Sequence, residues 1–469
     1  MTMTKNIKTL VITFVLLALT IGGYFGAKAY QKAKAEKAAA AAQTDYTLPE
    51  TIPLFRADRE ELARINFAGE GFALVKIDQE WAAEPPFPGP LDQDQIGYSL
   101  LWSLTDISAM RIIEESPADL SVYGLDNPPD RVIITKTNGE SAEFFGGNNT
   151  PTRDGRYIML KDDPKVYVVS SYSSDVLFSK ADKFRIKTLF SAFEMADLER
   201  FIFDSGDTHI DIALKADDDT AAPFFASHVM RTPYTRAYGV SSDKLGSIVE
   251  ALQNLTVQTF ADPNPASPAL YGLDKPSRLF IELSTGESID LQLGKVEGAS
   301  RYARKTGTAE VFTIADPAVL STVTAFSLVD KFALIVNIAD VNSFTARGGP
   351  QNITSEIRRT GTGDEVEETY FVGGKQAEER SYKAFYQALI GLLADAEHPN
   401  RPQRGGTGTA EITIEYTLNN PAGKKMSIAL VPYNRDFYAL DRDGVIEFLV
   451  SRAQVRSIYD TLGKIAYID

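Results

Sequence analysis

The chain has 469 residues, with 48 Lys and Arg against 63 Asp and Glu, so its formal net charge is −15 at neutral pH. Residues 1–43 hold six Lys and one Glu, a surplus of five positive charges, so the remaining chain carries −20. A body this acidic argues against nucleic acid as a partner and against lying flat on anionic lipid. With no Cys and three His, zinc or thiol chemistry would need an unusual set of ligands.

The N-terminal region has the composition of a membrane segment. After a short tail at 1–8, residues 9–27 carry no charge and are mostly apolar. A helix of this length spans roughly 28 Å, enough to cross the hydrocarbon core of a bilayer, which predicts a transmembrane helix. The alternative is a cleaved signal peptide with Ala27-Lys28-Ala29 as its cleavage site, although the apolar stretch is long for one. Residues 28–57 begin as an Ala- and Lys-rich stretch, which predicts a semi-rigid helical stalk and linker.

The lysines that flank this segment and the short N-terminus before it indicate opposite orientations in the membrane. Lys5 and Lys8 precede the segment, and four lysines follow it between 28 and 37. The positive-inside rule alone would therefore leave the C-terminal region in the cytoplasm. A short N-terminus before a single span is, however, typical of a signal anchor. We therefore expect a single-pass protein of the cell membrane whose C-terminal region is extracytoplasmic.

A short sequence motif occurs twice in the rest of the chain and indicates a repeat. Tyr-Gly-Leu-Asp-x-Pro stands at 123–128 and again at 271–276, an offset of 148 residues, which is too long for a solenoid unit and suits a duplicated domain. After each copy, two β-branched and aromatic runs flank a Gly-Glu turn, which predicts a hairpin. The signature residues of the repeat are Tyr123, Gly124, Leu125, Pro128 and Gly139 in the first copy and Tyr271, Gly272, Leu273, Pro276 and Gly286 in the second.

Two interpretations of this motif are open. In the structural one, Gly permits a left-handed backbone, Leu fills the core, and Pro enters a strand where no ladder N–H is needed. In the functional one, the two tyrosines present aromatic faces to a peptide or a glycan. We favour the structural interpretation, because a turn that is repeated together with its apolar neighbours is what the folding of a module requires.

A helix is predicted upstream of each motif from apolar residues that are spaced three and four apart. These residues are Ile96, Leu100, Leu101 and Leu104 in the first module and Leu245, Ile248, Leu252 and Leu255 in the second. A third, degenerate module lacks the motif but has a corresponding helix, with apolar positions at Tyr382, Phe385, Leu389 and Leu393. The predicted fold class is α+β: an N-terminal transmembrane helix followed by three repeated modules, at 58–192, 193–335 and 336–469, each with an antiparallel β-meander and one amphipathic helix.

The chain offers no clear signature of a catalytic, cofactor-binding or metal site. His209 lies in the oxygen-rich stretch Asp204–Asp211, but a turn that leads into an alternating strand explains this stretch more simply. Asp441–Gly444 begins like a calcium loop, but the twelfth position is Arg452 instead of Glu, so we predict a hairpin turn. Asp217–Asp219 predicts a solvated loop. We therefore predict no enzyme activity, no cofactor and no metal.

The order of these features resembles the bacterial domain-of-unknown-function family 4340. In that family a single N-terminal membrane segment precedes modules with an aromatic residue before a proline, a helix, a Tyr-Gly-Leu-x-x-Pro turn, a Gly-Glu hairpin and a Gly-x-x-Tyr strand. Trp81 with the prolines Pro85, Pro86 and Pro88 supplies the first element here, and Tyr234 supplies a weakened form of it in the second module. The resemblance implies no reaction. It implies an accessory role in ABC-transport or gliding-type envelope systems.

The expected function is therefore that of a non-catalytic, membrane-anchored accessory or scaffold protein, with the membrane and other envelope or transporter proteins as partners. One alternative is an extracellular protein that binds a ligand such as a peptide or glycan in a cleft between modules. Another is a hydrolase whose carboxylates only the fold would bring together. The third module, with His398 and the glycine-rich loop at 405–408, is where we expect a specialised partner site.

Overall fold

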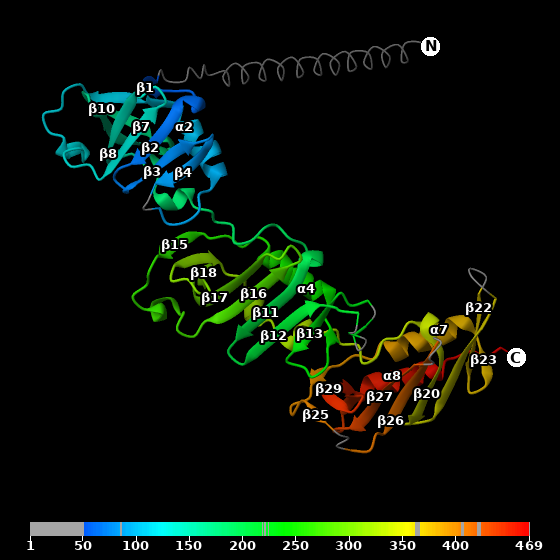
Figure 1. The fold of residues 1–469 in the computed structure, drawn as a ribbon. Coiled ribbons are helices and arrows are strands. Elements are labelled where there is room, and N and C mark those ends of the chain that lie inside the picture. Colours follow the sequence, from blue (N-terminus) through cyan, green and yellow to red (C-terminus); the bar gives the residue numbers. More distant parts are fainter. Residues whose placement is uncertain are drawn as a thin grey trace, which may run out of the picture. The chain divides into compact units, whose positions relative to one another are not determined.

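The computed structural model describes residues 51–84, 87–217, 219, 222–223, 225–361, 366–404, 408–419 and 424–468. Its contacts divide the chain into two compact units, Met1–Ile186 and Lys187–Asp469. Within the described residues, the first unit contains a large and a two-stranded antiparallel sheet, and the second contains two large antiparallel sheets (Figure 1). The predicted membrane span at 9–27 and the predicted stalk up to residue 50 lie outside the described residues.

In the first unit, the two-stranded sheet pairs β1 (Ile52–Arg56) with β5 (Asp106–Ala109), so the end of the predicted linker forms a strand. The large sheet has the strand order β4-β3-β2-β7-β8-β9-β10-β6. Its strands are β2 (Leu62–Phe67), β3 (Phe72–Ile77), β4 (Glu80–Glu84), β6 (Arg111–Glu114), β7 (Asp130–Lys136), β8 (Ser141–Asn149), β9 (Gly155–Leu160) and β10 (Asp163–Ser170).

In the second unit, the first sheet has the order β14-β13-β12-β11-β16-β17-β18-β19-β15. Its strands are β11 (Leu198–Ser205), β12 (Thr208–Leu214), β13 (His228–Thr232), β14 (Tyr238–Gly239), β15 (Thr259–Asp262), β16 (Ser277–Leu283), β17 (Ser288–Glu297), β18 (Ser300–Lys305) and β19 (Val311–Ala315).

The second sheet of this unit has the order β23-β22-β21-β20-β26-β27-β28-β29-β24, and β25 also pairs with β29. Its strands are β20 (Val341–Gly348), β21 (Ile353–Thr360), β22 (Glu367–Val372), β23 (Lys375–Ala377), β24 (Ala396–Glu397), β25 (Gln403–Arg404), β26 (Ile412–Leu418), β27 (Lys425–Pro432), β28 (Phe437–Arg442) and β29 (Val445–Ser451).

The three large sheets share one connectivity. In each, the opening strand (β2, β11 or β20) pairs with the first strand of the meander (β7, β16 or β26). The strand that follows the helix (β6, β15 or β24) pairs with the last meander strand at the far side of the sheet. The chain thus crosses from one side of the sheet to the other through the helix and then returns to the centre. The third sheet keeps this order although its sequence lacks the Tyr-Gly-Leu turn.

Helices precede and follow the meander of each sheet. Those before it are η2 (Gln95–Leu101, a π-helix) continued by α2 (Trp102–Leu104), then α4 (Ser242–Leu252) and α7 (Glu379–Ile390). Those after it are α3 (Ser171–Leu177), α5 (Val319–Thr322) with α6 (Ala325–Leu328), and α8 (Arg452–Leu462). Short 3-10 turns lie at Arg59–Glu61, Ser121–Tyr123, Ala181–Phe184, Met195–Asp197, Pro268–Tyr271 and Ile338–Asp340.

The helix before each meander buries its apolar stripe. In α4, Leu245, Ile248 and Leu252 are at most 1% exposed, and in α7 Tyr382 and Phe385 are fully buried. Burial of one helical face against a sheet supplies most of the stability of a short helix. The first unit has its own buried cluster, whereas residues of both sheets of the second unit belong to a single cluster.

The predicted fold class, α+β, is wrong for the residues that the structure describes. These residues are mostly β, with 45% strand against 20% helix, and they form four antiparallel sheets. None of the helices in the described ranges is long and apolar enough to cross a membrane. Each described module also has a further helical segment after its meander, so one helix per module was too few. Short edge strands such as β14 and β24 carry no periodic pattern, and the sequence therefore underestimates the strand content.

A close backbone approach fixes the motif against its own hairpin. A Cβ atom on Gly147 would lie 2.2 Å from the carbonyl oxygen of Tyr123, and one on Gly294 would lie 2.1 Å from that of Tyr271. Both glycines are in the second strand of the hairpin that follows the motif, β8 or β17. The motif turn can therefore sit on this strand only where the strand has no side chain.

We predict that Gly294→Ala destabilises the first sheet of the second unit by about 1–3 kcal/mol, because the added methyl group has to displace backbone. The control is Gly246→Ala in α4, where an added Cβ meets nothing within 4 Å. That change should stabilise the same sheet by about 0.5–1 kcal/mol. Hydrogen–deuterium exchange of amides in β16 and β17 measures both effects. Equal protection in the two variants would show that the close approach is not a constraint.

Candidate functional site

The motif tyrosines hold equivalent positions in the two modules. Tyr123 donates its hydroxyl to Glu114 Oε2 at 2.8 Å, and Tyr271 donates to Asp262 Oδ2 at 2.9 Å. The acceptor comes in each case from the strand before the motif, β6 or β15. This hydrogen bond to a carboxylate raises the pKa of both phenols. The hydroxyls are thus held as neutral donors that tie the turn to the edge of the sheet.

The other signature residues surround these tyrosines. Gly124 and Gly272 both have φ +69°, in the left-handed region, and Leu125 and Leu273 are both 2% exposed. Gly139 and Gly286 lie in the hairpin turns with φ +90° and +84°. Pro128 and Pro276 stand just before β7 and β16. Each motif tyrosine also packs against a second tyrosine at 5.0 Å, Tyr157 or Tyr302.

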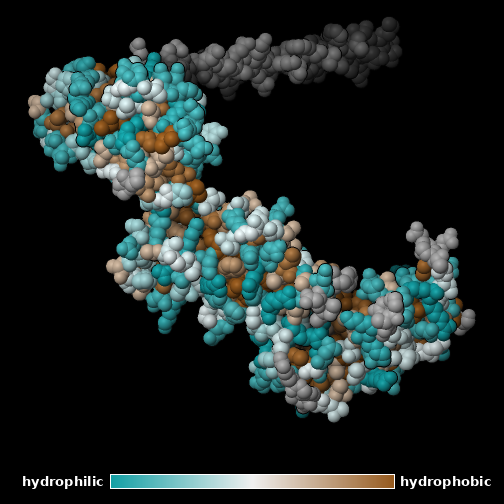
Figure 2. Space-filling model, viewed as in Figure 1, coloured by the Kyte–Doolittle hydropathy of each residue, from teal (hydrophilic) through white to brown (hydrophobic). Residues whose placement is uncertain are grey.

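Each motif turn also exposes a large aliphatic side chain that the sequence interpretation missed. Val122 is 67% exposed and Leu270 is 60% exposed, and each directly precedes the motif tyrosine. The signal was present, since both copies have an aliphatic residue at a position that the turn does not need for its core. On the faces seen in Figure 2, hydrophobic residues occur in patches among hydrophilic ones.

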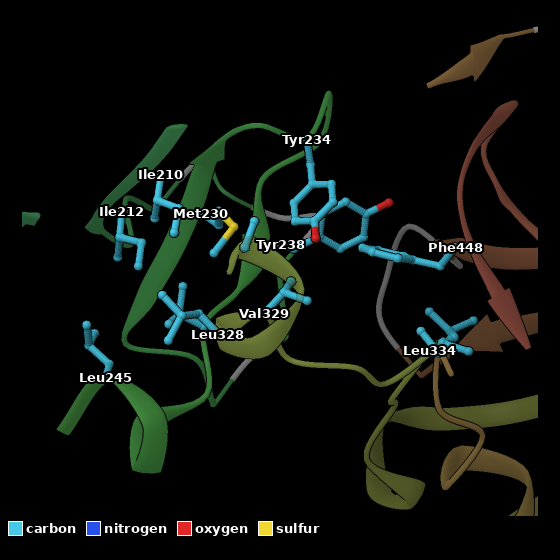
Figure 3. Packing of buried hydrophobic residues seen from close by; sticks show 14 of the residues in the cluster. Ile210, Ile212, Met230, Tyr234, Tyr238, Leu245, Leu328, Val329, Leu334 and Phe448 are labelled. Atoms are coloured by element: carbon cyan, nitrogen blue, oxygen red, sulfur yellow. The ribbon is translucent and has the colours of Figure 1, made fainter. Parts of the chain in front are cut away.

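A second candidate site lies within the second unit, where its two sheets meet. Tyr238 on β14 of the first sheet and Tyr234 in the loop before it point toward Phe448 on β29 of the second (Figure 3). The ring centroids of Tyr234 and Phe448 are 5.0 Å apart, and those of Tyr238 and Phe448 are 4.9 Å apart. All three residues are at most 5% exposed. We call this contact the aromatic junction.

Hydrogen bonds between the two sheets surround the aromatic junction. Tyr234 donates its hydroxyl to Glu397 Oε1 at 2.7 Å. The backbone N–H of Thr235 donates to Glu447 Oε1 at 2.7 Å. The pKa of Tyr234 is raised far above its usual range. Burial is the largest cause, and the hydrogen bond to Glu397 is the second. Burial likewise raises the pKa of Tyr238. Both phenols therefore stay neutral at physiological pH.

Glu447 is a buried acid at the centre of these contacts. Its residue is 1% exposed, and among the described residues its Oε2 atom has no hydrogen-bond partner. A carboxylate in this position depends on the donors that Thr235 supplies, because an unsatisfied buried acceptor is destabilising by about 1–3 kcal/mol. The two sheets are thus coupled through a polar contact as well as through the aromatic rings.

A cavity of about 370 Å³ lies beside the junction, lined by the loop between β12 and β13, by residues of the second sheet and by the segment that connects the two sheets. Its apolar wall includes Phe332, Leu334 and Met426. A second cavity of about 170 Å³ shares Leu334, Met426 and Arg442 with the first, so the two adjoin. We call the pair the junction cleft.

The prediction of a solvated loop is wrong at Asp219. It lines the larger cavity, is 8% exposed, and accepts hydrogen bonds from both terminal nitrogens of Arg231 at 2.6 and 2.7 Å. The side-chain hydrogen bonds from Arg231 are the largest influence that lowers its pKa. Asp219 is therefore a buried carboxylate that pairs with an arginine whose side chain is 38% exposed, whereas Asp218 lies outside the described residues.

The remaining candidates from the sequence have structural positions. His209 contacts Asp204 across the β11–β12 hairpin. The predicted turn at Asp441–Gly444 joins β28 to β29, with φ +53° at Asp443 and +80° at Gly444. Within the described residues there is no group of three or more His, Cys, Asp or Glu side chains that could hold a metal ion.

His398 of the third module is 4% exposed and packs edge-on against Tyr433, with ring centroids 5.2 Å apart. Its Nδ1 accepts a hydrogen bond from the backbone N–H of Asn400 at 3.2 Å, and burial lowers its pKa. The neutral imidazole is therefore the form that the fold accommodates. The glycines at 405 and 406 of the predicted partner loop lie outside the described residues.

Comparison with known proteins identifies the family of the chain. The sequence profile of the family Domain of unknown function (DUF4340) matches residues 81–276 and 231–395, which together span about two thirds of the chain. The chain therefore belongs to this family. No curated protein and no solved structure matches it.

We predict that the stability of the second unit falls as the pH drops below about 6.5, the ordinary pKa of His. Below that pH, His398 binds a proton in the unfolded chain but stays neutral in the folded protein, because burial lowers its pKa in the folded state. Above that pH both states are neutral and the contribution disappears. Calorimetric unfolding of the wild type and of His398→Gln between pH 5 and 8 measures this. The variant should lose less stability on acidification, and identical pH profiles would contradict the prediction.

We predict that Phe448→Ala destabilises the contact between the two sheets of the second unit by about 3–5 kcal/mol, the usual range for a buried Phe. Limited proteolysis and amide exchange over β13, β14 and β29 report the loss. The control is Phe280→Ala on β16, since Phe280 is only half-buried. If both variants lose protection equally in these strands, the aromatic junction has no special part in joining the sheets.

Proposed function

We propose that the protein is a non-catalytic binding protein, an accessory or scaffold component of a bacterial envelope complex. Its modules would stand at the cell membrane on the extracytoplasmic side and contact partner proteins through the motif turns. The observation that carries the proposal is the repeated surface at these turns. Val122 and Leu270 each project beside a tyrosine whose hydroxyl is held by a carboxylate.

The motif turns are held in a fixed conformation and expose apolar side chains, and both properties suit a contact surface. Large apolar side chains that are exposed on an otherwise polar surface are typical of protein–protein contacts. The tyrosine–carboxylate bonds fix both turns before binding, so a partner meets a preformed surface and less conformational entropy is lost. The third sheet reaches the same strand order without the motif. Topology alone therefore does not require the exposed aliphatic residues.

A role in an ABC-transport or gliding-type complex is supported by the family resemblance alone. Fold does not fix function, so the site has to carry the test. The acidic body, with an excess of 15 negative charges over the whole chain, favours partners with basic or neutral contact surfaces.

We predict that Val122→Glu combined with Leu270→Glu reduces capture of partner proteins at least fivefold, because a buried charge at each contact opposes docking. The measurement is co-purification after a membrane-impermeant crosslinker is applied to intact cells whose outer layers are permeable to it. The matched control is Ile77→Glu, which places the same charge at an aliphatic residue that is 55% exposed on β3.

Capture that is unchanged in the double variant would refute the motif turns as the contact surface. Capture that occurs only with a membrane-permeant crosslinker would place the modules inside the cytoplasm and refute the proposed location. Amide exchange of the purified variants shows whether both units remain folded.

A second candidate function is the binding of a small ligand in the junction cleft. The observation that favours it is the cavity of about 370 Å³ with an apolar wall and several charged groups. Pockets of this size and lining are the usual binding sites for small molecules. This candidate needs no contact at the motif turns, so the two functions can be tested separately.

A further inference from the structure

The first module lacks a strand that the other two modules have. In the second module β14 pairs antiparallel with β13, and in the third β23 pairs in the same way with β22. β13 and β22 are the third strands counted from the opening strand, and the corresponding strand of the first module is β4. Among the described residues, no further strand pairs with β4, which forms the edge of its sheet (Figure 1). A strand position beside β4 is therefore open.

Hydrogen bonds show which residues of the first module correspond to β14 and β23. In each module, a backbone N–H after the final helical segment donates to a carbonyl oxygen just before the helix that precedes the meander. These donor–acceptor pairs are Asp330–Gly239, Ile468–Gln376 and Ile186–Pro90, with distances of 2.7, 2.9 and 3.2 Å. Gly239 lies in β14 and Gln376 lies in β23, so Pro90 is their counterpart. The residue before it, Gly89, is then the counterpart of Tyr238 on β14.

The backbone at Gly89 explains why no strand forms beside β4. Gly89 has φ +131°, outside the range of a β-strand, and its N–H donates to the carbonyl oxygen of Phe87 at 3.0 Å in a tight turn. Pro88 and Pro90 flank it, and their rings fix φ at about −65°, far from the value of about −140° that is typical of antiparallel strands. The chain therefore leaves the ladder at the position where Tyr238 continues it in the second module.

A side-chain amide takes the place of part of the missing strand. Gln93 donates through Nε2 to the carbonyl oxygen of Trp81 at 2.7 Å, and its Oε1 accepts from the Trp81 N–H at 3.3 Å. The backbone groups of Trp81 therefore point away from β3. Because alternate residues of a strand direct these groups to the same side, those of Ala83 point away from β3 as well, and no described residue bonds them. The open edge thus offers the N–H and C=O groups of two residues.

A cavity of about 340 Å³ lies along this edge. Its described lining residues are uncharged and are Trp81, Ala83, Phe87, Gly89, Leu91 and Gln93. Trp81 belongs to the buried core of the module, and Phe87 and Leu91 pack against that core as partly buried residues. The space beside β4 therefore combines an apolar wall with free backbone groups, the two features that bind an added strand.

The other face of β4 is acidic. Glu80 and Glu84 alternate with Trp81 and Ala83, so their side chains lie on the opposite face of the strand. Glu84 accepts from Arg64 at 2.6 Å, whereas Glu80 has no ion pair with any described residue. If two copies of the chain paired through Trp81 and Ala83, Glu80 of each would face Glu84 of the other. Like charges in such positions are destabilising, so the edge disfavours a second copy and favours a strand with basic residues.

We propose that the open edge of β4 binds an extended peptide segment of a partner protein as an added antiparallel strand. The backbone of this segment exchanges hydrogen bonds with Trp81 and Ala83 and displaces the amide of Gln93. Its apolar side chains face the cavity, and basic side chains at the alternate positions lie over the acidic face. This surface is a contact additional to the motif turns of the proposed function.

The test is a fluorescence titration of the full-length chain in which Trp102→Phe leaves Trp81 as the single tryptophan. The probe is acetyl-Lys-Val-Lys-Val-Lys-amide, which presents valines to the cavity and lysines to the acidic face. We expect saturable binding that changes the emission of Trp81. N-methylation of both valine nitrogens removes the donors opposite Trp81 and Ala83 and should weaken binding at least tenfold. N-methylation of the central lysine nitrogen, which points to solvent, should change it by less than about twofold.

Variants of the protein locate the site. Ala83→Pro removes an outward donor but none of the bonds between β3 and β4, so it should weaken binding at least fivefold. Gln93→Ala removes the amide that competes for Trp81, so it should strengthen binding at least threefold. The matched control is Gln95→Ala, which changes an exposed glutamine that does not line the cavity and should leave binding unchanged. Amide exchange of β2 and β3 shows whether each variant is folded, and Gln93→Ala decides the matter if Ala83→Pro unfolds.

Three results would overturn the proposal: no saturable binding of the probe, equal binding of the peptide with N-methylated valines, or no gain in affinity in the Gln93→Ala variant. A dimer of the wild type that Ala83→Pro dissociates would also overturn it, because a second copy would then occupy the edge. The double variant Val122→Glu with Leu270→Glu should bind the probe as the wild type does. Strand addition at β4 and partner capture at the motif turns are therefore judged independently.

Discussion

The second unit depends on the contact of Tyr234 and Tyr238 with Phe448. This contact joins the first sheet to the last meander strand of the next sheet, and one cluster contains buried residues of both sheets. The polar partners follow from it, since the buried Glu447 receives a donor from Thr235 across the same boundary. Separation of the sheets would expose three aromatic rings and remove the hydrogen bonds that Thr235 donates to Glu447. Residues from both sides of this boundary also line the junction cleft.

The repeated connectivity and the repeated motif impose different constraints. All three large sheets have the same strand order, whereas only the first two modules carry the Tyr-Gly-Leu turn. The order therefore follows from hydrophobic patterning and strand pairing, and the turn is an addition to it. Where the turn is present, Gly147 or Gly294 makes room for it and a tyrosine–carboxylate bond holds it. Because this turn is firmly held and exposes an aliphatic side chain, we propose it as the contact surface for a partner.

Local patterns in the sequence predicted local structure. The glycines of the motif and of the hairpin turns have the positive φ angles that a tight turn needs, and the apolar helical positions are mostly buried. The strand content was underestimated, because a strand of two residues such as β14 has no detectable period. The aromatic junction could not be predicted from the sequence for a related reason. Tyr234 and Phe448 are 214 positions apart in the chain, and a contact between such distant residues leaves no local signal. The prediction for Asp219 was wrong for the same reason, because no local sequence pattern links Asp219 to its partner Arg231.

Native-state hydrogen exchange at increasing denaturant is the most direct test of whether the two sheets of the second unit form one cooperative body. Each amide yields a free energy of opening, and amides that open together converge on one value as denaturant rises. We expect the slowest amides of β13 and β29 to converge on a common opening, because the aromatic junction and Glu447 couple their strands. Separate openings, with β29 exchanging while β13 remains protected, would contradict the coupling and with it the junction cleft as a preformed site.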